Sequence, residues 1–513
     1  MSETPGIVYL VGAGPGDPGL LTRRGYEVLR RADVVVYDQL ANDRLLDLAP
    51  ASAERIFAGK TQGKLTITQG DMNRLLAERA GRGLKVVRLK GGDPYVFGRG
   101  AEEAEHLHRA GIPFIVIPGV TAGVGVTAYA GVPVTHRDAA SAVAFVTGHD
   151  DPEATTTDRV RLDWSALAVF PGTLVIYMGV TRLASICRTL VREGKPETTP
   201  AAMIQSGTLA RQRTVTGTLA TLADRVSAAG LGPPALLVVG DVIDRRPGLN
   251  WFEERPLFGR RIVVTRPEDD ADRSASILED LGAEVLTAPT VAIRPVVDTS
   301  ELDAAIARLA EFDWLVFTSS NGVKHLLDRI DALGLDLRAL GSIKLAAIGP
   351  ATAETLAAYR LRADLVPPSF RSEALAEALI ALASGQRVLL ARADRGRTIL
   401  KEELSRVAKV EQVAVYRNVD AERLPDDVAR RIEDGSIDWI TLTSSAIAER
   451  LHALVSDSAR ARIGRSIKLA TISPVTSATV AKLGWPVAAE AEDFTWDGLV
   501  AAIVRAESRA ISP

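Results

Sequence analysis

The stretch IVYLVGAGPGDPGLLT, residues 7 to 22, decides the fold of the first half of the chain. Residues 7 to 11 are aliphatic or aromatic, which predicts a buried strand. Four glycines mixed with two prolines and an aspartate then predict a turn. Residues 20 to 31 predict an amphipathic helix. A glycine turn between a strand and a helix lets backbone amides approach a ligand, because no Cβ is in the way.

The same turn partly matches the dinucleotide fingerprint G-x-G-x-x-G, which is followed by an acidic residue about 20 positions later. Gly12, Gly14 and Asp38 fit this pattern, but Asp17 stands where the third glycine belongs. A carboxylate at that position would repel a pyrophosphate at the helix N-terminus. A nucleotide-dependent oxidoreductase is therefore the less favoured alternative.

Two further strands of the first half also end in glycine-rich turns. The strand at 85–89 leads into GGDP, and the strand at 114–117 leads into PGVTAGVG. Alternating strands and helices predict a parallel sheet, and such sheets bind ligands at the C-terminal ends of their strands. Each turn alone can be purely structural, but three equivalent turns indicate a site. Strands at 173–177, 201–205 and 234–242 predict a second lobe.

Composition excludes several classes of protein. The chain of 513 residues is 47% apolar and 24% charged, and its net charge is −3, so it has no general attraction to nucleic acid or to an anionic membrane. Its single cysteine, Cys187, excludes an internal disulfide framework, and six histidines without cysteine partners predict no metal site. No signal peptide and no apolar run of about 18 residues is found, so we expect a cytoplasmic protein.

Several blocks of the first half resemble the tetrapyrrole (class III) methyltransferase family, in particular its uroporphyrinogen-III C-methyltransferases. They lie within residues 6 to 252 and read VGAGPGDPGLLT, ADVVVYDQL, VRLKGGDPYVFGRGAEE, IPGVTAGVGVTAYAGVPVTHRD, YMGV and LNWF. The resemblance implies a homodimer with its active site between two α/β lobes, tetrapyrrole substrates and the cofactor S-adenosylmethionine. It also implies methylation of uroporphyrinogen III at C2 and C7, which gives precorrin-2. No stretch resembles the dehydrogenase and ferrochelatase portion of sirohaem synthase.

The resemblance also assigns roles to residues. It implies Asp38 as proton acceptor and Lys60 as proton donor, whereas spacing alone would make them a turn cap and a solvated loop lysine. The cofactor-binding residues that it implies are Pro15, Gly91, Gly92, Asp93, Val96, Thr121, Ala122, Met178 and Gly207. Because arginine pairs well with the carboxylates of the substrate, candidate substrate-binding residues are Arg23, Arg88, Arg99 and Arg137. After Lys60 the sequence departs from the family pattern, which leaves substrate contacts there open.

The second half repeats itself with a lag of 124 to 126 residues. The paired segments are RRIVVTR (260–266) and QRVLLAR (386–392), DWLVFTSSNGV (313–323) and DWITLTSSAIA (438–448), and IKLAAIGPATAETL (343–356) and IKLATISPVTSATV (467–480). Each copy alternates strands with helices, which predicts two similar parallel-sheet lobes. The segments at 285–296 and 410–419 are candidate crossovers between them.

This half resembles the uroporphyrinogen-III synthase family through VTRP, FTSSNGV, AAIGPATAETL and VAVYR, across residues 258 to 510. The resemblance implies two lobes joined by a pair of strands, and cyclisation of hydroxymethylbilane. It matches Tyr416 to a family tyrosine, a candidate proton donor to the departing hydroxyl. Polar residues at strand ends and helix starts are candidates for binding carboxylates, although each alone is more simply a helix cap: Thr265, Ser319, Ser320, Asn321, Thr352, Thr443, Ser444 and Ser445.

The sequence thus predicts an α/β fusion of two enzymes. We expect a methyltransferase at 1–252 (lobes about 6–140 and 141–245), an exposed linker at 253–258 that proteases cut first, and a synthase at 259–513 (lobe A about 259–292 plus 419–513, lobe B about 297–414). In the alternative, the second half binds tetrapyrrole without catalysis, which Ser473 in the place of Gly349 keeps open. The sequence does not decide whether the product serves cobalamin or sirohaem synthesis.

Overall fold

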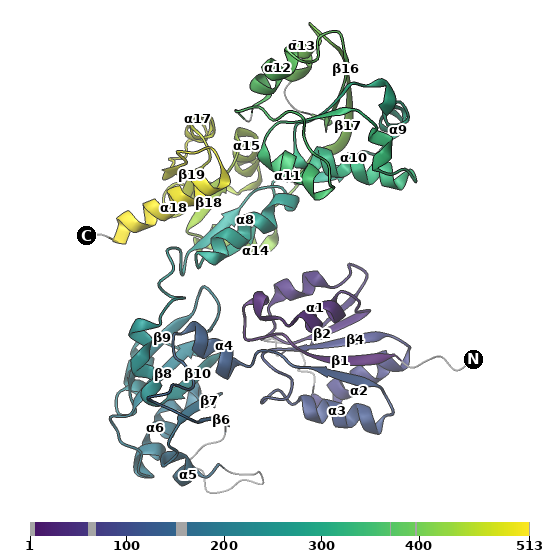
Figure 1. Ribbon diagram of the computed structural model, residues 1–513. Helices are drawn as coiled ribbons and strands as arrows, with labels where there is room; N and C mark the ends of the chain where they lie inside the picture. Colours follow the sequence, from purple (N-terminus) through teal and green to yellow (C-terminus); the bar gives the residue numbers. More distant parts are fainter. Residues whose placement is uncertain (1–5, 60–67, 150–161, 370, 396–397, 512–513) are drawn as a thin grey trace. The chain divides into compact units, whose positions relative to one another are not determined.

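The chain divides into two compact units, each built from two five-stranded sheets with helices (Figure 1). The computed structural model describes residues 6–59, 68–149, 162–369, 371–395 and 398–511. Unit 1 comprises Met1–Arg260 with Leu278–Glu284, and unit 2 comprises Arg261–Ile277 with Val285–Pro513. In the described part of the chain, every helix is too short or too polar to cross a membrane.

The first lobe of unit 1 is an all-parallel sheet in the order β3-β2-β4-β1-β5. Its strands are β1 (Ile7–Gly12), β2 (Val34–Tyr37), β3 (Glu54–Phe57), β4 (Lys85–Lys90) and β5 (Phe114–Ile117). α1 (Arg23–Leu29) packs on one face, and α2 (Gln69–Gly81) and α3 (Gly100–Arg109) pack on the other (Figure 1). The C-terminal ends of all five strands therefore lie at one edge, as predicted for the turns after β1, β4 and β5.

The second lobe of unit 1 is a mixed sheet in the order β6-β7-β10-β8-β9. Its strands are β6 (Val143–Thr147), β7 (Thr173–Tyr177), β8 (Pro200–Gln205), β9 (Arg213–Thr218) and β10 (Ala235–Val239). Only β6 and β7 pair in parallel, and the other pairs are antiparallel. α4 (Ala122–Tyr129) packs on one face, whereas α6 (Leu183–Arg192) and α7 (Leu222–Ala228) pack on the other. α4 thereby lies between the two sheets of unit 1 (Figure 1).

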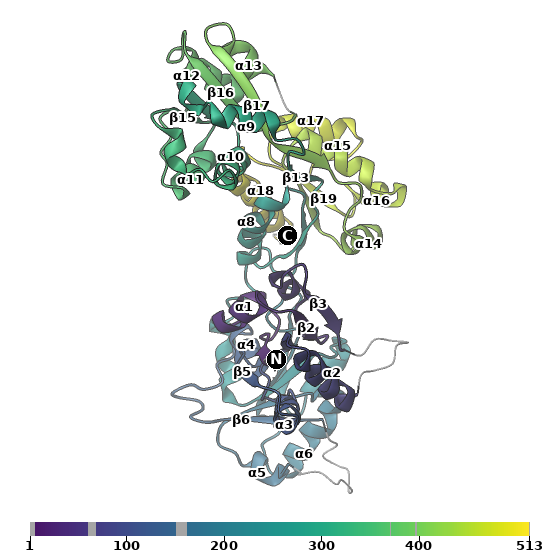
Figure 2. The same cartoon turned by 90° about the vertical axis from the view of Figure 1, so that its right-hand side faces the viewer.

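One lobe of unit 2 has the sheet order β13-β17-β16-β14-β15. Its strands are β13 (Val291–Pro295), β14 (Trp314–Phe317), β15 (Lys344–Ala347), β16 (Arg387–Ala393) and β17 (Lys409–Asp420). β13 and β17, which contain parts of the two predicted crossovers, pair antiparallel, and the other pairs are parallel. α10 (Ser320–Ala332) and α11 (Pro350–Ala358) pack on one face, and α12 (Ser372–Ile380) and α13 (Ile399–Leu404) on the other (Figure 2).

The other lobe of unit 2 has the sheet order β12-β11-β18-β19-β20. Its strands are β11 (Arg261–Val264), β12 (Glu284–Thr287), β18 (Trp439–Leu442), β19 (Lys468–Thr471) and β20 (Ala489–Glu490), and its helices include α15 (Ser445–Leu454), α17 (Pro474–Lys482) and α18 (Trp496–Ile511). The repeated segments form β16, β14 and β15 in one sheet and β11, β18 and β19 in the other, in the same order. The predicted internal repeat is thus confirmed.

Candidate active site

Three glycine turns of the first lobe pack backbone to backbone at the edge where β1, β4 and β5 end. Gly14 and Gly92 exchange two backbone hydrogen bonds, of 3.2 Å and 2.7 Å. A Cβ on Gly119 would lie 2.2 Å from the carbonyl oxygen of Gly92 and 2.7 Å from Cα of Gly12. Such distances leave no space for a side chain, so the convergence of the turns requires glycine.

Asp93 ties two of these turns together. Its Oδ1 accepts a hydrogen bond from the backbone N–H of Tyr95 (2.8 Å), and its Oδ2 accepts one from the backbone N–H of Gly119 (3.0 Å). The structure thereby brings together the predicted cofactor-binding residues Gly91, Gly92 and Asp93 with the segment that leads to Thr121. Val96 lies three residues beyond Asp93 in the same turn, where it is half-buried.

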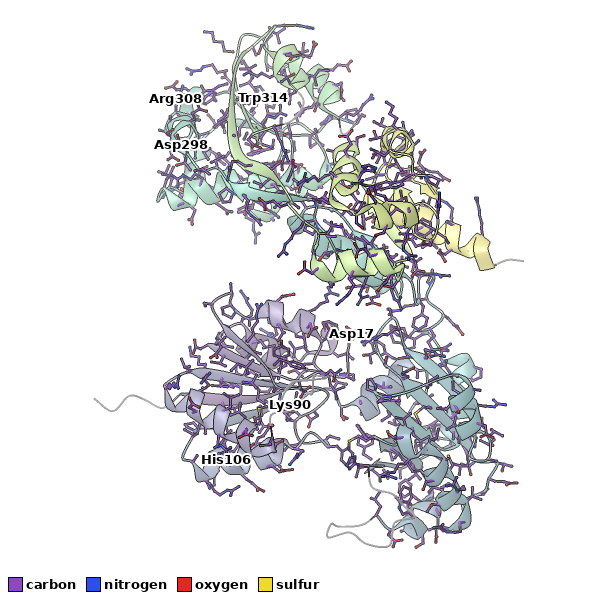
Figure 3. The ribbon with its side chains drawn as sticks, turned by 180° about the vertical axis from the view of Figure 1, so that it is seen from behind. Asp17, Lys90, His106, Asp298, Arg308 and Trp314 are labelled. Atoms are coloured by element: carbon purple, nitrogen blue, oxygen red, sulfur yellow. The ribbon has the colours of Figure 1, made fainter. Side chains whose placement is uncertain are left out.

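Turns of the second lobe meet the first lobe at the same place. Asp17 donates its backbone N–H to Oγ1 of Thr208 (2.9 Å), and an added Cβ on Gly16 would touch that oxygen at 2.8 Å. The hydroxyl of Tyr177 accepts the backbone N–H of Gly123 (2.6 Å) and shares a hydrogen bond with the Thr121 hydroxyl (2.7 Å). Figure 3 labels Asp17 where the two lobes of unit 1 meet.

These contacts place the remaining predicted cofactor-binding residues around the same junction. Pro15 lies against Gly125 of α4, since a Cβ on Gly125 would be 2.7 Å from Cγ of Pro15. Gly207 lies against Val126 in the same way, at 2.3 Å. Ala122 begins α4, and Met178 directly follows Tyr177. Burial raises the pKa of Tyr177 above its usual value, which keeps the hydroxyl protonated.

Backbone strain is concentrated in these turns. Six residues other than glycine have a positive φ in the part of the chain that the structure describes, and five of them lie in unit 1: Phe97 (54°), Arg99 (59°), Met178 (57°), Ser206 (49°) and Thr208 (68°). They follow β4, β7 and β8. Because a positive φ is unfavourable for side-chain-bearing residues and strained residues cluster at functional sites, this distribution indicates the location of the site independently of any motif.

Asp38, the predicted proton acceptor, lies at the C-terminal end of β2 beside β4. Its carboxylate accepts hydrogen bonds from the backbone N–H of Leu40 (3.1 Å) and from the guanidinium of Arg88 (3.2 Å). A Cβ on Gly91 would be 2.5 Å from Cβ of Leu40, so the segment after Asp38 touches the glycine turn after β4. Lys60, the predicted proton donor, lies outside the described residues.

A buried ionic network lies behind Asp38. Arg88, whose side chain is 7% exposed, also contacts Glu103 (3.4 Å), and Lys90 contacts the same carboxylate oxygen at 3.0 Å. Glu103 is fully buried, and Lys90 lies inside the first lobe (Figure 3). Burial, and then the charge of Arg88, lower the pKa of Lys90, which Glu103 partly offsets. The predicted substrate ligand Arg88 is therefore committed to Asp38 and Glu103.

The other arginines predicted to bind substrate lie at the surface. Arg23 pairs with Glu27 (3.2 Å) one helical turn away, and Arg99 pairs with Glu102 (2.7 Å) at the start of α3. Arg137 is exposed in the loop between α4 and β6. Among the described residues, Arg88 is the one of these four arginines with a hydrogen bond to another predicted site residue, Asp38.

Sequence reasoning missed the side chains that hold the turns in place. Tyr177 begins the block YMGV and Glu103 ends the block VRLKGGDPYVFGRGAEE, but neither side chain was assigned a role, and Gln212 lies in no quoted block. A signal for Glu103 was present, because Arg88 and Lys90 alternate within the apolar run of β4 and therefore share one face, where they need a buried acid. No such signal exists for Thr208, which reaches Asp17 across 191 residues of sequence.

The carboxylate of Asp17 has a structural role. Its Oδ1 accepts the backbone N–H of Gly19 (2.7 Å), and its Oδ2 accepts the hydroxyl of Tyr129 (2.6 Å). Burial, followed by the hydrogen bond to Asp17, raises the pKa of Tyr129. The position that a pyrophosphate would need at the start of the first helix is thus filled by a fixed negative charge, which disfavours the dinucleotide alternative.

In unit 2, Tyr416 lies beside another predicted site residue, Ser319. Its hydroxyl is 3.0 Å from Oγ of Ser319, and its ring stacks on the imidazole of His325 at 5.6 Å between centroids. Ser319 is the N-cap of α10, where its Oγ accepts the backbone N–H of Gly322 (3.0 Å). The predicted catalytic tyrosine and one predicted carboxylate ligand are therefore neighbours at the C-terminal end of β14.

The remaining polar candidates of unit 2 are mostly engaged within the fold. Ser444 caps α15, Oγ of Ser320 donates to the carbonyl of Ala351 (3.2 Å), and Oγ1 of Thr265 donates to the carbonyl of Thr441 (2.5 Å). Oγ of Ser445 accepts from Thr479 (2.8 Å). Asn321 and Thr352 are buried, and Thr443 is half-buried. Capping is thus confirmed as a role of Ser319 and Ser444.

Ser473, the departure from the glycine of the repeat, fits its position. Its φ is −162° and that of Gly349 is −170°, so both residues have extended backbone that any residue adopts. Ser473 also caps α17, since its Oγ accepts from the backbone N–H of Thr476 at 3.4 Å. The loop therefore does not need glycine, and the reason for doubting the second half weakens.

Comparison with known proteins identifies the family of each half. Two family models match the chain: Tetrapyrrole (Corrin/Porphyrin) Methylases at residues 7–223, and Uroporphyrinogen-III synthase HemD at residues 272–501. The Porphyrin biosynthesis protein HemD of Ruminiclostridium josui is 35% identical over 458 residues, which are 88% of this chain and 89% of that protein. The chain belongs to the tetrapyrrole methylase and uroporphyrinogen-III synthase families, one in each half.

The methylase half has further similar proteins. The Uroporphyrinogen-III C-methyltransferase of Bacillus subtilis is 42% identical over 335 residues, 65% of this chain and 68% of that protein. A crystal structure of the uroporphyrin-III C-methyl transferase of Thermus thermophilus, complexed with S-adenyl homocysteine, is 40% identical. It covers 47% of this chain and 99% of its own, with a TM-score of 0.40. The described residues of the methylase and synthase halves hold no cluster of metal-ligating side chains.

Proposed function

We propose that unit 1 transfers methyl groups from S-adenosylmethionine to C2 and C7 of uroporphyrinogen III, giving precorrin-2. Unit 2 supplies that substrate by cyclising hydroxymethylbilane. The observation that carries the proposal for unit 1 is the convergence of three glycine turns with the strained turns of the second lobe. The two family memberships support the substrate class, because the product of one activity is the substrate of the other.

The predicted cofactor-binding residues suit the chemistry of the cofactor. They include one carboxylate, Asp93, and no lysine or arginine, which favours a ligand with a cationic sulfonium. Met178 is 47% exposed beside Tyr177 and offers an apolar contact. When bound, S-adenosylmethionine supplies an electrophilic methyl group. The role of the turns is to orient donor and acceptor, which can lower a barrier by about 7–11 kcal/mol.

We assign proton transfer in unit 1 to Asp38 and Lys60. Asp38 suits the role of acceptor because Arg88 fixes its carboxylate at the sheet edge, next to the turn of Gly91 and Gly92. Lys60 follows β3 in the sequence and lies outside the described residues, so its assignment rests on the resemblance alone. A positioned acid or base accelerates such a step by roughly 10²–10⁴.

In unit 2 we assign Tyr416 as the residue that donates a proton to the departing hydroxyl of the substrate. Its hydroxyl lies 3.0 Å from Ser319, whose oxygen in turn accepts an amide at the start of α10. Amides at helix N-termini and nearby hydroxyls suit a polyanionic bilane. Catalysis in unit 2 is therefore assigned to the hydroxyl of Tyr416 alone. The helix N-terminal amides and nearby hydroxyls hold the linear tetrapyrrole in the folded shape that cyclises.

The test is to supply hydroxymethylbilane to the purified protein with and without S-adenosylmethionine and to identify the tetrapyrrole. We expect the type III isomer without the donor and a dimethylated product with it. Only the spontaneous type I ring in the donor-free sample would favour the alternative, a second half that binds tetrapyrrole without catalysis. We also propose that the protein forms a homodimer through unit 1, which light scattering of the full chain tests, and that it is cytoplasmic.

A further inference from the structure

Thr208 is a strained residue that one buried side chain holds in place. Its φ of 68° turns its backbone N–H toward Oε1 of Gln212, which accepts it at 2.8 Å. Both residues are 3% exposed, so no water can replace that acceptor, and an unpaired buried N–H is costly. Oγ1 of Thr208 in turn accepts the backbone N–H of Asp17. Gln212 therefore acts, through Thr208, on the glycine turn after β1.

The amide group of Gln212 is itself fixed from the other side. Its Nε2 donates to Oε1 of Glu253 (2.8 Å) and to the backbone carbonyl of Tyr129 (3.4 Å). Since a carboxylate and a carbonyl only accept, the amide oxygen must face Thr208. Tyr129 closes the ring, because its hydroxyl donates to Asp17.

The carboxylate of Glu253 accepts hydrogen bonds from two further side chains. Its Oε1 also accepts the hydroxyl of Thr214 (2.5 Å), and its Oε2 accepts Arg246 (2.5 Å). Arg246 further donates to the carbonyl of Ala130 and to Oδ1 of Asn250 (2.8 Å). The side chain of Glu253 is 15% exposed, so these are charge-assisted hydrogen bonds in a largely dry environment.

The segment around Glu253 packs on the end of α4. Nε1 of Trp251 donates to the carbonyl of Ala128 (3.1 Å), and the rings of Phe252 and Tyr129 lie 4.7 Å apart. The guanidinium of Arg255 stacks over Trp251 at 4.5 Å. Leu257 is fully buried. The predicted linker at 253–258 is therefore not an exposed tether, because Glu253, Arg255 and Leu257 belong to the packing of unit 1.

We propose that Gln212 and Glu253 are positioning residues of the cofactor site, so that the segment leading from unit 1 into β11 forms part of the scaffold that binds S-adenosylmethionine. The proposal rests on the methyl-transfer function proposed for unit 1. Neither residue contacts the cofactor in this scheme. Both act through Thr208 and Asp17, and their loss weakens cofactor binding more than it slows the methyl transfer of the saturated enzyme.

The test uses two single variants and their combination in the full chain. Gln212→Glu places two carboxylates against each other, and Glu253→Gln turns an amide N–H toward another donor, Gln212 or Arg246. In the double variant, Glu at 212 accepts from Thr208 and from Gln at 253, whose oxygen accepts Arg246, and only the longer hydrogen bond to the carbonyl of Tyr129 (3.4 Å) is not restored. Titration calorimetry with S-adenosylhomocysteine should give a Kd at least tenfold higher for each single variant, and within about threefold of the wild type for the double variant.

Two further measurements keep the test specific. Saturating both substrates should restore kcat of each single variant to near the wild-type value, so that the change appears in KM for the donor. Thr214→Val removes only one hydrogen bond to Glu253 and is the milder variant to use if a single variant does not fold. It should raise Kd about threefold. Glu54→Gln, which removes an ion pair with Arg79 (3.0 Å) in the same unit, is the matched control and should leave Kd unchanged.

The outcomes separate the two proposals. Wild-type protein that does not bind S-adenosylhomocysteine would refute the function proposed for unit 1. Wild-type binding together with unchanged Kd in both single variants would overturn the positioning role alone. Weakened single variants without recovery in the double variant would also overturn it, because the hydrogen-bond pairing would then not be the cause.

Discussion

A methyl group added at Gly119 has no space in the first lobe of unit 1. In Gly119→Ala the new Cβ would lie 2.2 Å from the carbonyl oxygen of Gly92, and both neighbouring turns are backbone that cannot rotate away. We expect a stability loss of about 1–3 kcal/mol and at least a tenfold loss of cofactor affinity, measured by thermal unfolding and calorimetry. Gly81→Ala, where nothing lies within 4 Å, is the control. Unchanged affinity in Gly119→Ala would contradict the proposed place of the cofactor.

Glu103 is the counter-charge for two buried cations. In Glu103→Gln, Arg88 and Lys90 lose the carboxylate that they share at 3.4 Å and 3.0 Å. Removing one partner of a buried ion pair costs about 3–5 kcal/mol. The free energy of unfolding of unit 1, measured in urea, should therefore fall by that amount. Adding Lys90→Met removes one of the two cations and should recover part of the loss. A double variant less stable than Glu103→Gln would mean that the Lys90 side chain stabilises the lobe through contacts other than its pairing with Glu103.

The residues of the site were predictable to the extent that motifs mark them. Glycines at strand ends are visible in the sequence because the turn itself needs them, and Asp93 stands within such a motif. Arg88 and its partner Asp38 were found, but its buried partner Glu103 was not, because Glu103 lies on a helix and only the packing of α3 on β4 brings it near. Strain at Met178 and Thr208 could not be predicted, because both are ordinary residues whose φ is set by tertiary contacts.

At the scale of elements, strands were predicted better than helix starts. The expected helix at 20–31 is a short 3-10 turn, Pro18–Leu20, followed by α1 from Arg23. Each of the two pieces has its own N-cap: Asp17 accepts the backbone N–H of Gly19 in the 3-10 turn, and Thr22 accepts that of Gly25 in α1. The expected strand at 234–242 ends at Val239, where Gly240 leaves the sheet with a φ of 144°. Local side-chain hydrogen bonds thus outweighed the helical periodicity.

The start of α17 allows a direct test of the departure at Ser473. Because its backbone is extended, Ser473→Gly should remove only the hydrogen bonds of the hydroxyl to the backbone N–H (3.4 Å) and the hydroxyl (3.2 Å) of Thr476, and replacing a capping serine by glycine costs a few tenths of a kcal/mol. We expect cyclisation of hydroxymethylbilane at the wild-type rate, measured by chromatography of the ring isomers. A tenfold gain in the glycine variant would show instead that the serine impairs the loop. Ser444→Gly, the same cap in α15, is the matched comparison.

At the scale of the molecule, the internal repeat was the most informative feature of the second half. Three pairs of similar segments form strands in the same order in two sheets, because similar apolar patterns make similar strand–helix units. The antiparallel pairing of β13 with β17 did not follow from the repeat, since both strands lie outside the three pairs of similar segments. The mixed sheet of β6–β10 likewise depends on pairing across the sheet, which the order of elements along the chain does not fix.

The two candidate sites lie in different units, so their activities should be separable in the intact chain. In Asp38→Asn the carboxylate that Arg88 holds at 3.2 Å loses its charge, and we expect loss of methyl transfer with cyclisation of hydroxymethylbilane intact. In Tyr416→Phe the hydroxyl 3.0 Å from Ser319 is removed, and we expect at least a tenfold slower cyclisation with normal methylation of supplied uroporphyrinogen III. Chromatography of both products in each variant is the measurement. Loss of both activities in either variant would mean that the two units depend on each other for catalysis, and normal rates of both would remove these side chains from the chemistry.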